Sequence, residues 1–143
     1  MTKDEALQVW FASAVHNWEI PVADGVAKSP VRTDSLLTAY PSTSVPDDAI
    51  LPYLTYDTAY SSWELGPVAV TVNLWFHTSS VDIPDAAARD LSKAIGYAGA
   101  RIPCDNGYIW LKRGAPFSKT LPTEDPNLKL CLINLTAEFL TVD

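Results

Sequence analysis

A strictly alternating stretch at residues 66–80 constrains the fold of this chain more than any other feature. Its sequence is GPVAVTVNLWFHTSS, in which the apolar residues at 68, 70, 72, 74 and 76 share one face. A period of two, carried by β-branched and aromatic residues, predicts a long strand with one buried face. The rest of the chain is therefore expected to pack against this strand.

Two neighbouring segments are expected to complete the centre of the fold. Residues 50–56 (ILPYLTY) predict a second strand, in which Pro52 indicates an edge strand or a strand start. Residues 84–95 predict a helix, with Pro84 in its first turn and Gly96 directly after its end. On this helix the apolar stripe is Ala87, Leu91, Ala94, Ile95 and Ala98, and the expected water-facing residues are Arg89, Asp90 and Lys93.

The two ends of the chain predict one more helix and two more strands. Residues 2–18 begin with a capping box, Thr2 and Glu5, and carry a broad apolar stripe that Pro21 is expected to end. Residues 108–113 and 129–141 predict strands, and PCDNG at 103–107 predicts a tight turn. The fold class expected is α+β: one domain over residues 1–143, with a mostly antiparallel four-stranded sheet and two helices packed on one face.

Two long connections interrupt this pattern. Residues 22–48 carry three prolines among Ser, Thr and Asp, and form either a surface arm or an arm that lies on a neighbouring subunit. The apolar residues Val31, Leu36, Leu37 and Tyr40 favour the second interpretation, and short strand pairing at 35–40 stays open. Residues 114–127 are expected to form the second connection. Deleting residues 28–37 is expected to leave the subunit folded and to weaken assembly.

Charge and composition exclude some classes of function. A net charge of −7 with a pI near 4.6 argues against binding to a phosphate backbone. No apolar run approaches the roughly 20 residues that span a bilayer, and the start of the chain lacks a signal-peptide pattern, so the cytosol is expected. Cys104 and Cys131 are expected to be small buried apolar residues rather than a disulfide.

Candidate catalytic groups are sparse in this sequence. It contains no GxSxG, GxGxxG, P-loop, HExxH or CxxC motif. His77, Asp57 and a serine could be written as a triad, but a chance match is the simpler interpretation. His16 has no His, Cys or carboxylate at metal-ligand spacing. The sequence thus predicts no catalytic residue, no metal site and no cofactor.

Large aromatic residues are the most unusual feature of the composition. Five tryptophans and six tyrosines occur, and Trp75, Tyr108 and Trp110 oppose the apolar strand faces. If helices cover one sheet face, these rings need cover from the chain's own loops or from another chain. The predicted oligomer or partner interface consists of Leu36, Leu37, Tyr40, Tyr53, Tyr60, Trp63, Trp75 and Phe117.

An ordered series of motifs links these segments to a known family. The series is YPSTSVPDDAILPYLTYD, a W-x-x-G turn, VTVNLWFHTSS, IPDAAARDLSKAIG, RIPCDNGYIWLKRGAPF and DPNLKLCLINLTAEFLT. Over residues 40–140 the chain resembles the tail terminator (tail completion) proteins of long-tailed bacteriophages and prophages. It departs from them at residues 22–37, which are longer than the usual link, and at Leu130, where a basic residue is expected.

The resemblance implies a non-enzymatic virion protein at the head–tail junction, assembled in the host cytoplasm. Such subunits form a ring, usually a hexamer, that caps the head-proximal end of the tail tube and stops its polymerisation. The ring contacts the major tail tube protein and docks the head-completion protein, while DNA passes through its lumen unread. The alternatives are a head–tail connector or stopper with basic loop tips facing a lumen, and a small hydrolase that uses His77.

Overall fold

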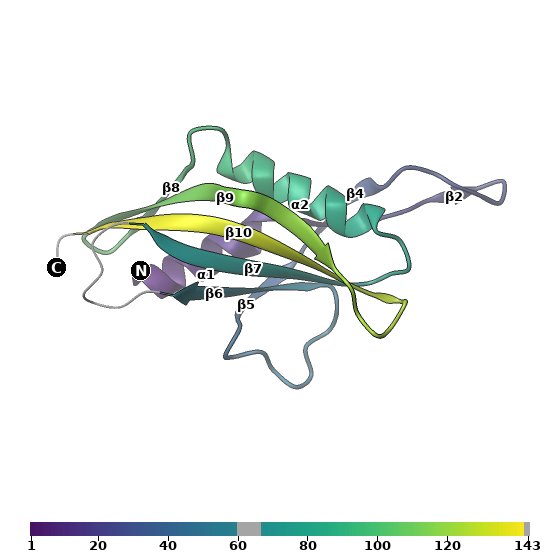
Figure 1. Ribbon diagram of the computed structural model, residues 1–143, viewed down its shortest axis with the longest axis horizontal. Coiled ribbons are helices and arrows are strands. Elements are labelled where there is room, and N and C mark those ends of the chain that lie inside the picture. The colour runs from purple at the N-terminus through teal and green to yellow at the C-terminus, as the bar shows by residue number, and fades with distance from the viewer. Residues whose placement is uncertain (60–66, 142–143) are drawn as a thin grey trace.

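The predicted long strand forms the middle of a six-stranded sheet (Figure 1). The computed structural model describes residues 1–59 and 67–141. In β7 (Val68–His77) alternate side chains are buried, as the period of two predicts. This strand pairs antiparallel with β6 (Tyr53–Ala59) on one side and with β10 (Leu128–Thr141) on the other.

The sheet is larger than the sequence predicts, and it is mixed. Its strand order is β5-β6-β7-β10-β9-β8, with β5 (Thr38–Pro41) parallel to β6. The expected four-stranded, mostly antiparallel sheet with two helices packed on one face is therefore wrong. The two outer strands, β5 and β8 (Ala100–Cys104), have only four and five residues and each contains a proline, so they are too short for a sequence pattern to reveal them. Because β5 pairs with the edge of β6 that β7 leaves free, the segment at 50–56 is not an edge of the sheet.

The second long connection is also mostly strand. Strand β9 (Gly107–Leu121) continues far beyond the predicted end at residue 113 and pairs with β10 along most of its length. Its register with β10 shifts between the pairs Leu135–Arg113 and Ile133–Ser118, so β9 carries extra residues at this point. Such a bulge breaks the alternation that identifies a strand in a sequence. The turn predicted at 103–107 is confirmed, with Asn106 at φ +64° between β8 and β9.

Helix α1 (Lys3–Ala14) has the predicted capping box but ends earlier than predicted. The Glu5 backbone N–H donates to the Thr2 hydroxyl, and the Thr2 N–H donates to the Glu5 carboxylate. After Ala14 the chain extends into β1 (His16–Glu19), which pairs with β4 (Val31–Leu36). Pairing with a segment distant in sequence thus overrides the helical pattern at residues 15–18, well before Pro21.

Helix α1 lies against the inner face of the sheet and touches both of its outer strands. The Gln8 side chain donates to the Ala39 carbonyl on β5 at 3.2 Å. At the other edge, the Met1 ammonium lies 2.6 Å from the Asp105 carboxylate, beyond the end of β8. Since one helix reaches both edges, the sheet must curl around it.

Helix α2 (Asp82–Ile95) begins two residues before the predicted start and ends at Gly96 as predicted. Gly96 has φ +76°, and its N–H donates to the Ser92 carbonyl at 3.0 Å. The helix packs on β1, β7, β9 and β10. Three expectations for its faces are wrong: Asp90 is buried, Ala94 is exposed, and Ala98 is exposed beyond the end of the helix.

The 22–48 segment is ordered rather than irregular. Strands β2 (Val22–Ala23) and β3 (Val26–Ala27) form a small hairpin that projects from one end of the molecule (Figure 1). Its turn residues, Asp24 and Gly25, both have positive φ, as a type I′ turn requires. The remainder of the segment contributes β4 and β5, followed by a loop at residues 42–52.

Side chains from α1, α2 and the strands of the large sheet join in a single hydrophobic core. Cys131 is buried and Cys104 is half-buried, and both are free thiols. Neither α1 nor α2, the helices in the described part of the chain, is long and apolar enough to cross a membrane.

Candidate functional site: an open sheet face, a hairpin arm and a groove

The outer face of the sheet carries a row of aromatic and apolar side chains. Tyr40, Tyr53 and Trp75 come from β5, β6 and β7. The ring centroids of Tyr40 and Tyr53 lie 5.7 Å apart, and those of Tyr53 and Trp75 lie 6.4 Å apart. Leu130 on β10 lies opposite Trp75, and Leu121 on β9 lies opposite Leu130. We call these five residues the aromatic row. All five are half-buried, and along their strands all but Leu121 alternate with side chains that point into the core.

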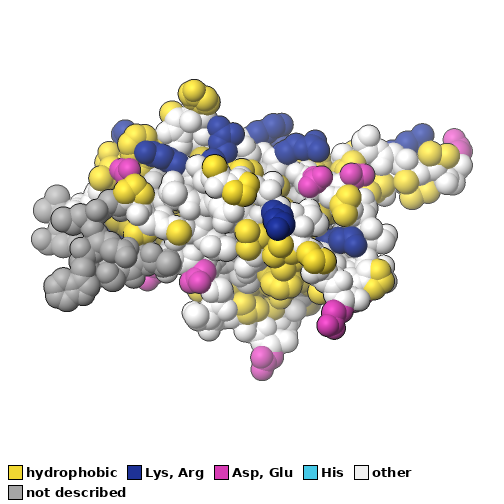
Figure 2. Space-filling view, in the orientation of Figure 1, with side chains coloured by type: hydrophobic (Ala, Val, Ile, Leu, Met, Phe, Trp, Pro, Cys, Tyr) yellow, Lys and Arg dark blue, Asp and Glu magenta, His cyan; other side chains and the backbone are white. Residues whose placement is uncertain are grey.

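Hydrogen bonding fixes the largest ring of this row. The Trp75 indole N–H donates to the Thr55 hydroxyl at 3.2 Å. Thr55 lies two residues after Tyr53 on β6 and therefore faces the same, outer side of the sheet. The row is thus a preformed surface of flat rings, the kind of side chain that anchors protein interfaces. Figure 2 shows hydrophobic side chains gathered on this side of the molecule, below its centre.

The structure separates the other predicted interface residues. Leu36 on β4 is 47% exposed, whereas its neighbour Leu37 is 1% exposed and belongs to the chain's own core. Phe117 is half-buried and packs against that core. Tyr60 and Trp63 lie outside the described residues. Leu37 is therefore removed from the candidate interface, and Tyr40, Tyr53 and Trp75 are the predicted residues that the fold brings together.

The β2–β3 hairpin, residues 22–27, is the most exposed apolar element; we call it the hairpin arm. Val22 is 68% exposed and Val26 is 57% exposed. Each strand of the arm has two residues, so its own pairs bury little surface. An isolated two-stranded hairpin is at best marginally stable in water. Contact with another chain would cover these valines and add order to the arm.

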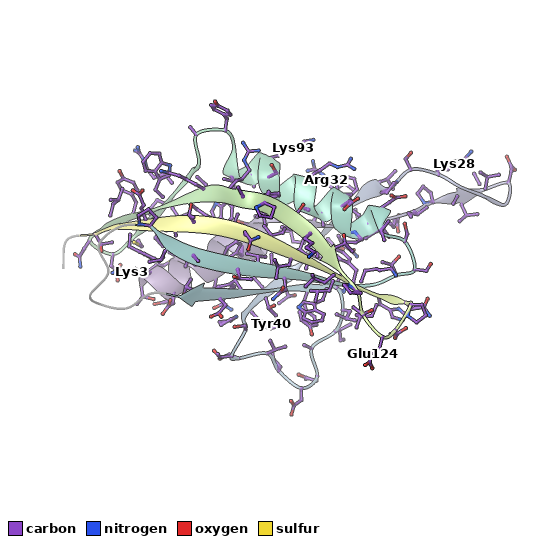
Figure 3. All side chains as sticks on the ribbon, viewed as in Figure 1. Lys3, Lys28, Arg32, Tyr40, Lys93 and Glu124 are labelled. Carbon is purple, nitrogen blue, oxygen red and sulfur yellow. The ribbon has the colours of Figure 1, made fainter. Side chains whose placement is uncertain are left out.

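A groove of about 530 Å³ separates the base of the hairpin arm from α2. One wall is the segment 27–30 with Lys28, and the other is the α2 side that carries Arg89 and Lys93. These three cations are exposed and have no ion pair among the described residues, whereas Asp82 is the exposed carboxylate of the lining. We call this space the arm–helix groove; Lys28 and Lys93 are labelled in Figure 3.

Asp90 lies beneath this groove and fixes β1 to α2. Its carboxylate is 8% exposed and accepts from the Trp18 indole N–H at 2.8 Å and from the His16 backbone N–H at 3.2 Å. The Arg32 guanidinium on β4 lies 3.9 Å from its other oxygen. Sequence reasoning missed Asp90, because its two hydrogen-bond donors lie more than 70 residues away and no local pattern marks them.

The structure does not bring His77 and Asp57 together as members of a catalytic triad. Asp57 lies opposite Thr71 in the β6–β7 register, six residues or about 20 Å along the strand from His77. A hollow of about 350 Å³ beside His77 is lined by Glu19 and Thr78. Within the described residues His77 makes no hydrogen bond to either. The same part of the chain holds no group of three or more His, Cys, Asp or Glu that could bind a metal ion.

Several of the described loops carry exposed acidic residues. Asp24 is in the hairpin turn, Asp47 and Asp48 are in the 42–52 loop, and Glu124 and Asp125 are between β9 and β10, all of them exposed.

Comparison of the chain with protein-family models, curated proteins and solved structures gives no match.

Proposed function

We propose that this chain is a structural subunit of a phage tail, of the tail terminator type. Copies assemble into a ring, usually a hexamer in that family, at the head-proximal end of the tail tube. The ring ends polymerisation of the major tail tube protein and offers a docking surface to the head-completion protein. The sequence resemblance over residues 40–140 motivates the assignment to this family, and the exposed hairpin arm supports a subunit that assembles with other chains.

The hairpin arm supports an assembling subunit because it places two valines far from the core. Exposed apolar side chains on a projecting element are costly unless another surface covers them. The same chain offers such a surface in the aromatic row, which neither α1 nor α2 covers. A patch that meets a different patch on the next copy is the heterologous contact from which rings are built.

The alternative functions receive less support. A connector or stopper that grips DNA is expected to present basic loop tips, whereas the hairpin turn, the 42–52 loop and the loop between β9 and β10 carry exposed acids. A net charge of −7 is consistent with a lumen that DNA crosses unread. A hydrolase would need His77 beside a nucleophile, and its nearest assigned partner, Asp57, lies about 20 Å away. The proposed role is therefore non-enzymatic, without metal or cofactor, in the virion neck.

The structure changes how this function is best tested. Deleting residues 28–37 would remove β4 and the buried Leu37, so the loss of assembly would not be separable from the loss of the fold. Replacing Val22 and Val26 by serine changes the arm alone. Val9 is a matched control, since it is 52% exposed on α1 and lies outside the arm.

The experiment measures ring formation by sedimentation and tube capping by electron microscopy, with the major tail tube protein of the same phage. The parent and Val9→Ser are expected to form rings and to limit tube length. The Val22→Ser/Val26→Ser variant is expected to associate about tenfold more weakly, since interface side chains of this kind contribute about 1–2 kcal/mol. A parent that stays monomeric and leaves tube length unchanged would refute the proposal.

A further inference from the structure

We propose that the 42–52 loop of one copy docks into the arm–helix groove of the next copy. In this contact Asp47 and Asp48 face Lys28, Arg89 and Lys93. The inference rests on the proposed function, because it names the surfaces through which the subunits meet. It commits the groove to a second copy of this chain.

The groove has the positive charge and the apolar lining that an acidic loop with an exposed isoleucine requires. Lys28 comes from the arm base, while Arg89 and Lys93 lie one turn apart on α2. Asp82 and Asp90 also line the groove, so its three cations exceed its two carboxylates, and Arg32 lies 3.9 Å from the Asp90 carboxylate. The half-buried Trp18 ring adds an apolar surface to the lining.

The loop has the complementary chemistry. Asp47 and Asp48 are exposed, and Ile50 beside them is 83% exposed, the most exposed aliphatic side chain in the described part of the chain. Two backbone hydrogen bonds hold the loop in turns: Ser44 N–H donates to the Pro41 carbonyl, and Ala49 N–H donates to the Pro46 carbonyl. The loop therefore offers two carboxylates and one apolar side chain on a partly ordered support.

The positions of loop and groove require two different copies. Figure 1 shows the 42–52 loop below the sheet, whereas α2 and the base of the arm lie above it. One subunit cannot bring its own loop to its own groove across the sheet. A head-to-tail contact between neighbours joins them and repeats around a ring or along a filament.

Charge favours a copy of this chain over a nucleic acid as the occupant. The net charge of −7 repels a second copy as it repels a polyanion, but a second copy confines its acids to local groups such as Asp47 and Asp48 and also carries cations. Figure 2 shows most basic side chains of this face along the upper border of the molecule, with some acidic side chains among them, and further acidic side chains at the lower border. Two such molecules attract when the lower border of one meets the upper border of the other. This attraction is expected to weaken as salt rises.

Charge reversal on each surface tests this contact. One variant carries Arg89→Glu and Lys93→Glu, the second carries Asp47→Lys and Asp48→Lys, and a third combines all four changes. The control is Asp57→Lys/Glu124→Lys, which changes net charge as much as the second variant but on exposed residues outside the loop. Sedimentation at about 50 and 300 mM salt gives the association constant, and circular dichroism verifies folding.

The two single-surface variants are expected to associate at least about tenfold more weakly than the parent, and the combined variant to recover most of that loss. The control is expected to associate like the parent. Rings that form equally well in all variants would overturn this inference and leave the proposed function standing. A combined variant as weak as its components would also overturn it. A parent that assembles neither alone nor on tail tubes would refute the proposed function itself.

A disulfide test reports the same contact without relying on charge. Asp48→Cys and Lys93→Cys on one chain are expected to give, on oxidation, a ladder of covalently linked subunits. Either cysteine alone is expected to give no ladder, since Cys131 is buried and Cys104 is only partly accessible. Absence of a ladder from assembled double-cysteine rings would overturn the inference.

Discussion

Asp90→Ala is expected to destabilise the fold more than any other removal of a charge in the described part of the chain. The change leaves the Trp18 indole N–H and the His16 backbone N–H without their shared acceptor. A hydrogen bond to a charged group contributes about 1.5–3 kcal/mol. Both donors are partly buried, so water can replace part of the lost hydrogen bonding. The free energy of unfolding is therefore expected to fall by about 2–4 kcal/mol.

This loss is measurable by urea unfolding followed through tryptophan fluorescence and circular dichroism. This loss is a large fraction of the total free energy of unfolding, which is about 5–15 kcal/mol for proteins in general. It corresponds to a fall in Tm of roughly 5–15 °C. Asp90→Asn keeps one acceptor oxygen and is expected to lose about half as much. Asp85→Ala, an exposed carboxylate on the same helix, is expected to lose less than about 1 kcal/mol.

A free energy of unfolding for Asp90→Ala within about 0.5 kcal/mol of the parent would refute this reasoning. It would mean that Trp18 and His16 find water or other acceptors at no cost. A loss equal to that of Asp85→Ala would lead to the same conclusion, because the helix dipole alone would then explain both.

Other outcomes follow from burial. Leu91→Asp places a carboxylate at a fully buried position and is expected to cost several kcal/mol, visible as a large fall in Tm; an unchanged Tm would contradict the packing of α2. Burial raises the pKa of Cys131 to about 11, so Ellman's reagent at pH 8 is expected to modify Cys104 first and Cys131 only as the protein unfolds. Burial also raises the pKa of Tyr56 to about 12, so stability is expected to fall as pH rises from 10 toward 12, and Tyr56→Phe is expected to remove that dependence. His77→Ala is expected to leave ring assembly unchanged in sedimentation.

The Tyr56 expectation has an independent structural basis. Its hydroxyl is buried and has no hydrogen-bond partner in the described part of the chain. The folded state therefore favours the neutral phenol, and the unfolded chain, with a pKa near 10, loses its proton first. Phenylalanine keeps the ring contact with Phe11, whose centroid is 5.1 Å away. The substitution is thus expected to be neutral or slightly stabilising at pH 7.

Local signals in the sequence predicted the parts of the fold that local interactions determine. The capping box of α1, the alternation of β7 and the glycine that ends α2 were all readable within a few residues. The parallel pairing of β5 with β6 was not, because four residues ending in proline carry no period. Residues 15–18 continue a helical pattern, yet they are extended because β4 offers them a partner.

The candidate site divides in the same way. Alternation placed Trp75 on the outer face, and the sheet then brought Tyr40 and Tyr53 beside it. Leu37 could not be distinguished from Leu36, since its burial depends on contacts that α1 and the sheet supply. The arm–helix groove was invisible, because its cations come from two segments about 60 residues apart in sequence.

The two outer strands decide how copies of this chain can meet. Pro41 on β5 and Pro103 on β8 each remove a backbone donor from an edge of the sheet, so pairing of one sheet edge with another is disfavoured. Association is then left to side chains on the hairpin arm, the aromatic row and the arm–helix groove. The arm continues from β1 and β4, and Asp90 fixes β1 to α2. The Asp90 contact therefore holds the base of the arm against α2, and in the proposed head-to-tail assembly this orientation is expected to decide between a closed ring and a filament.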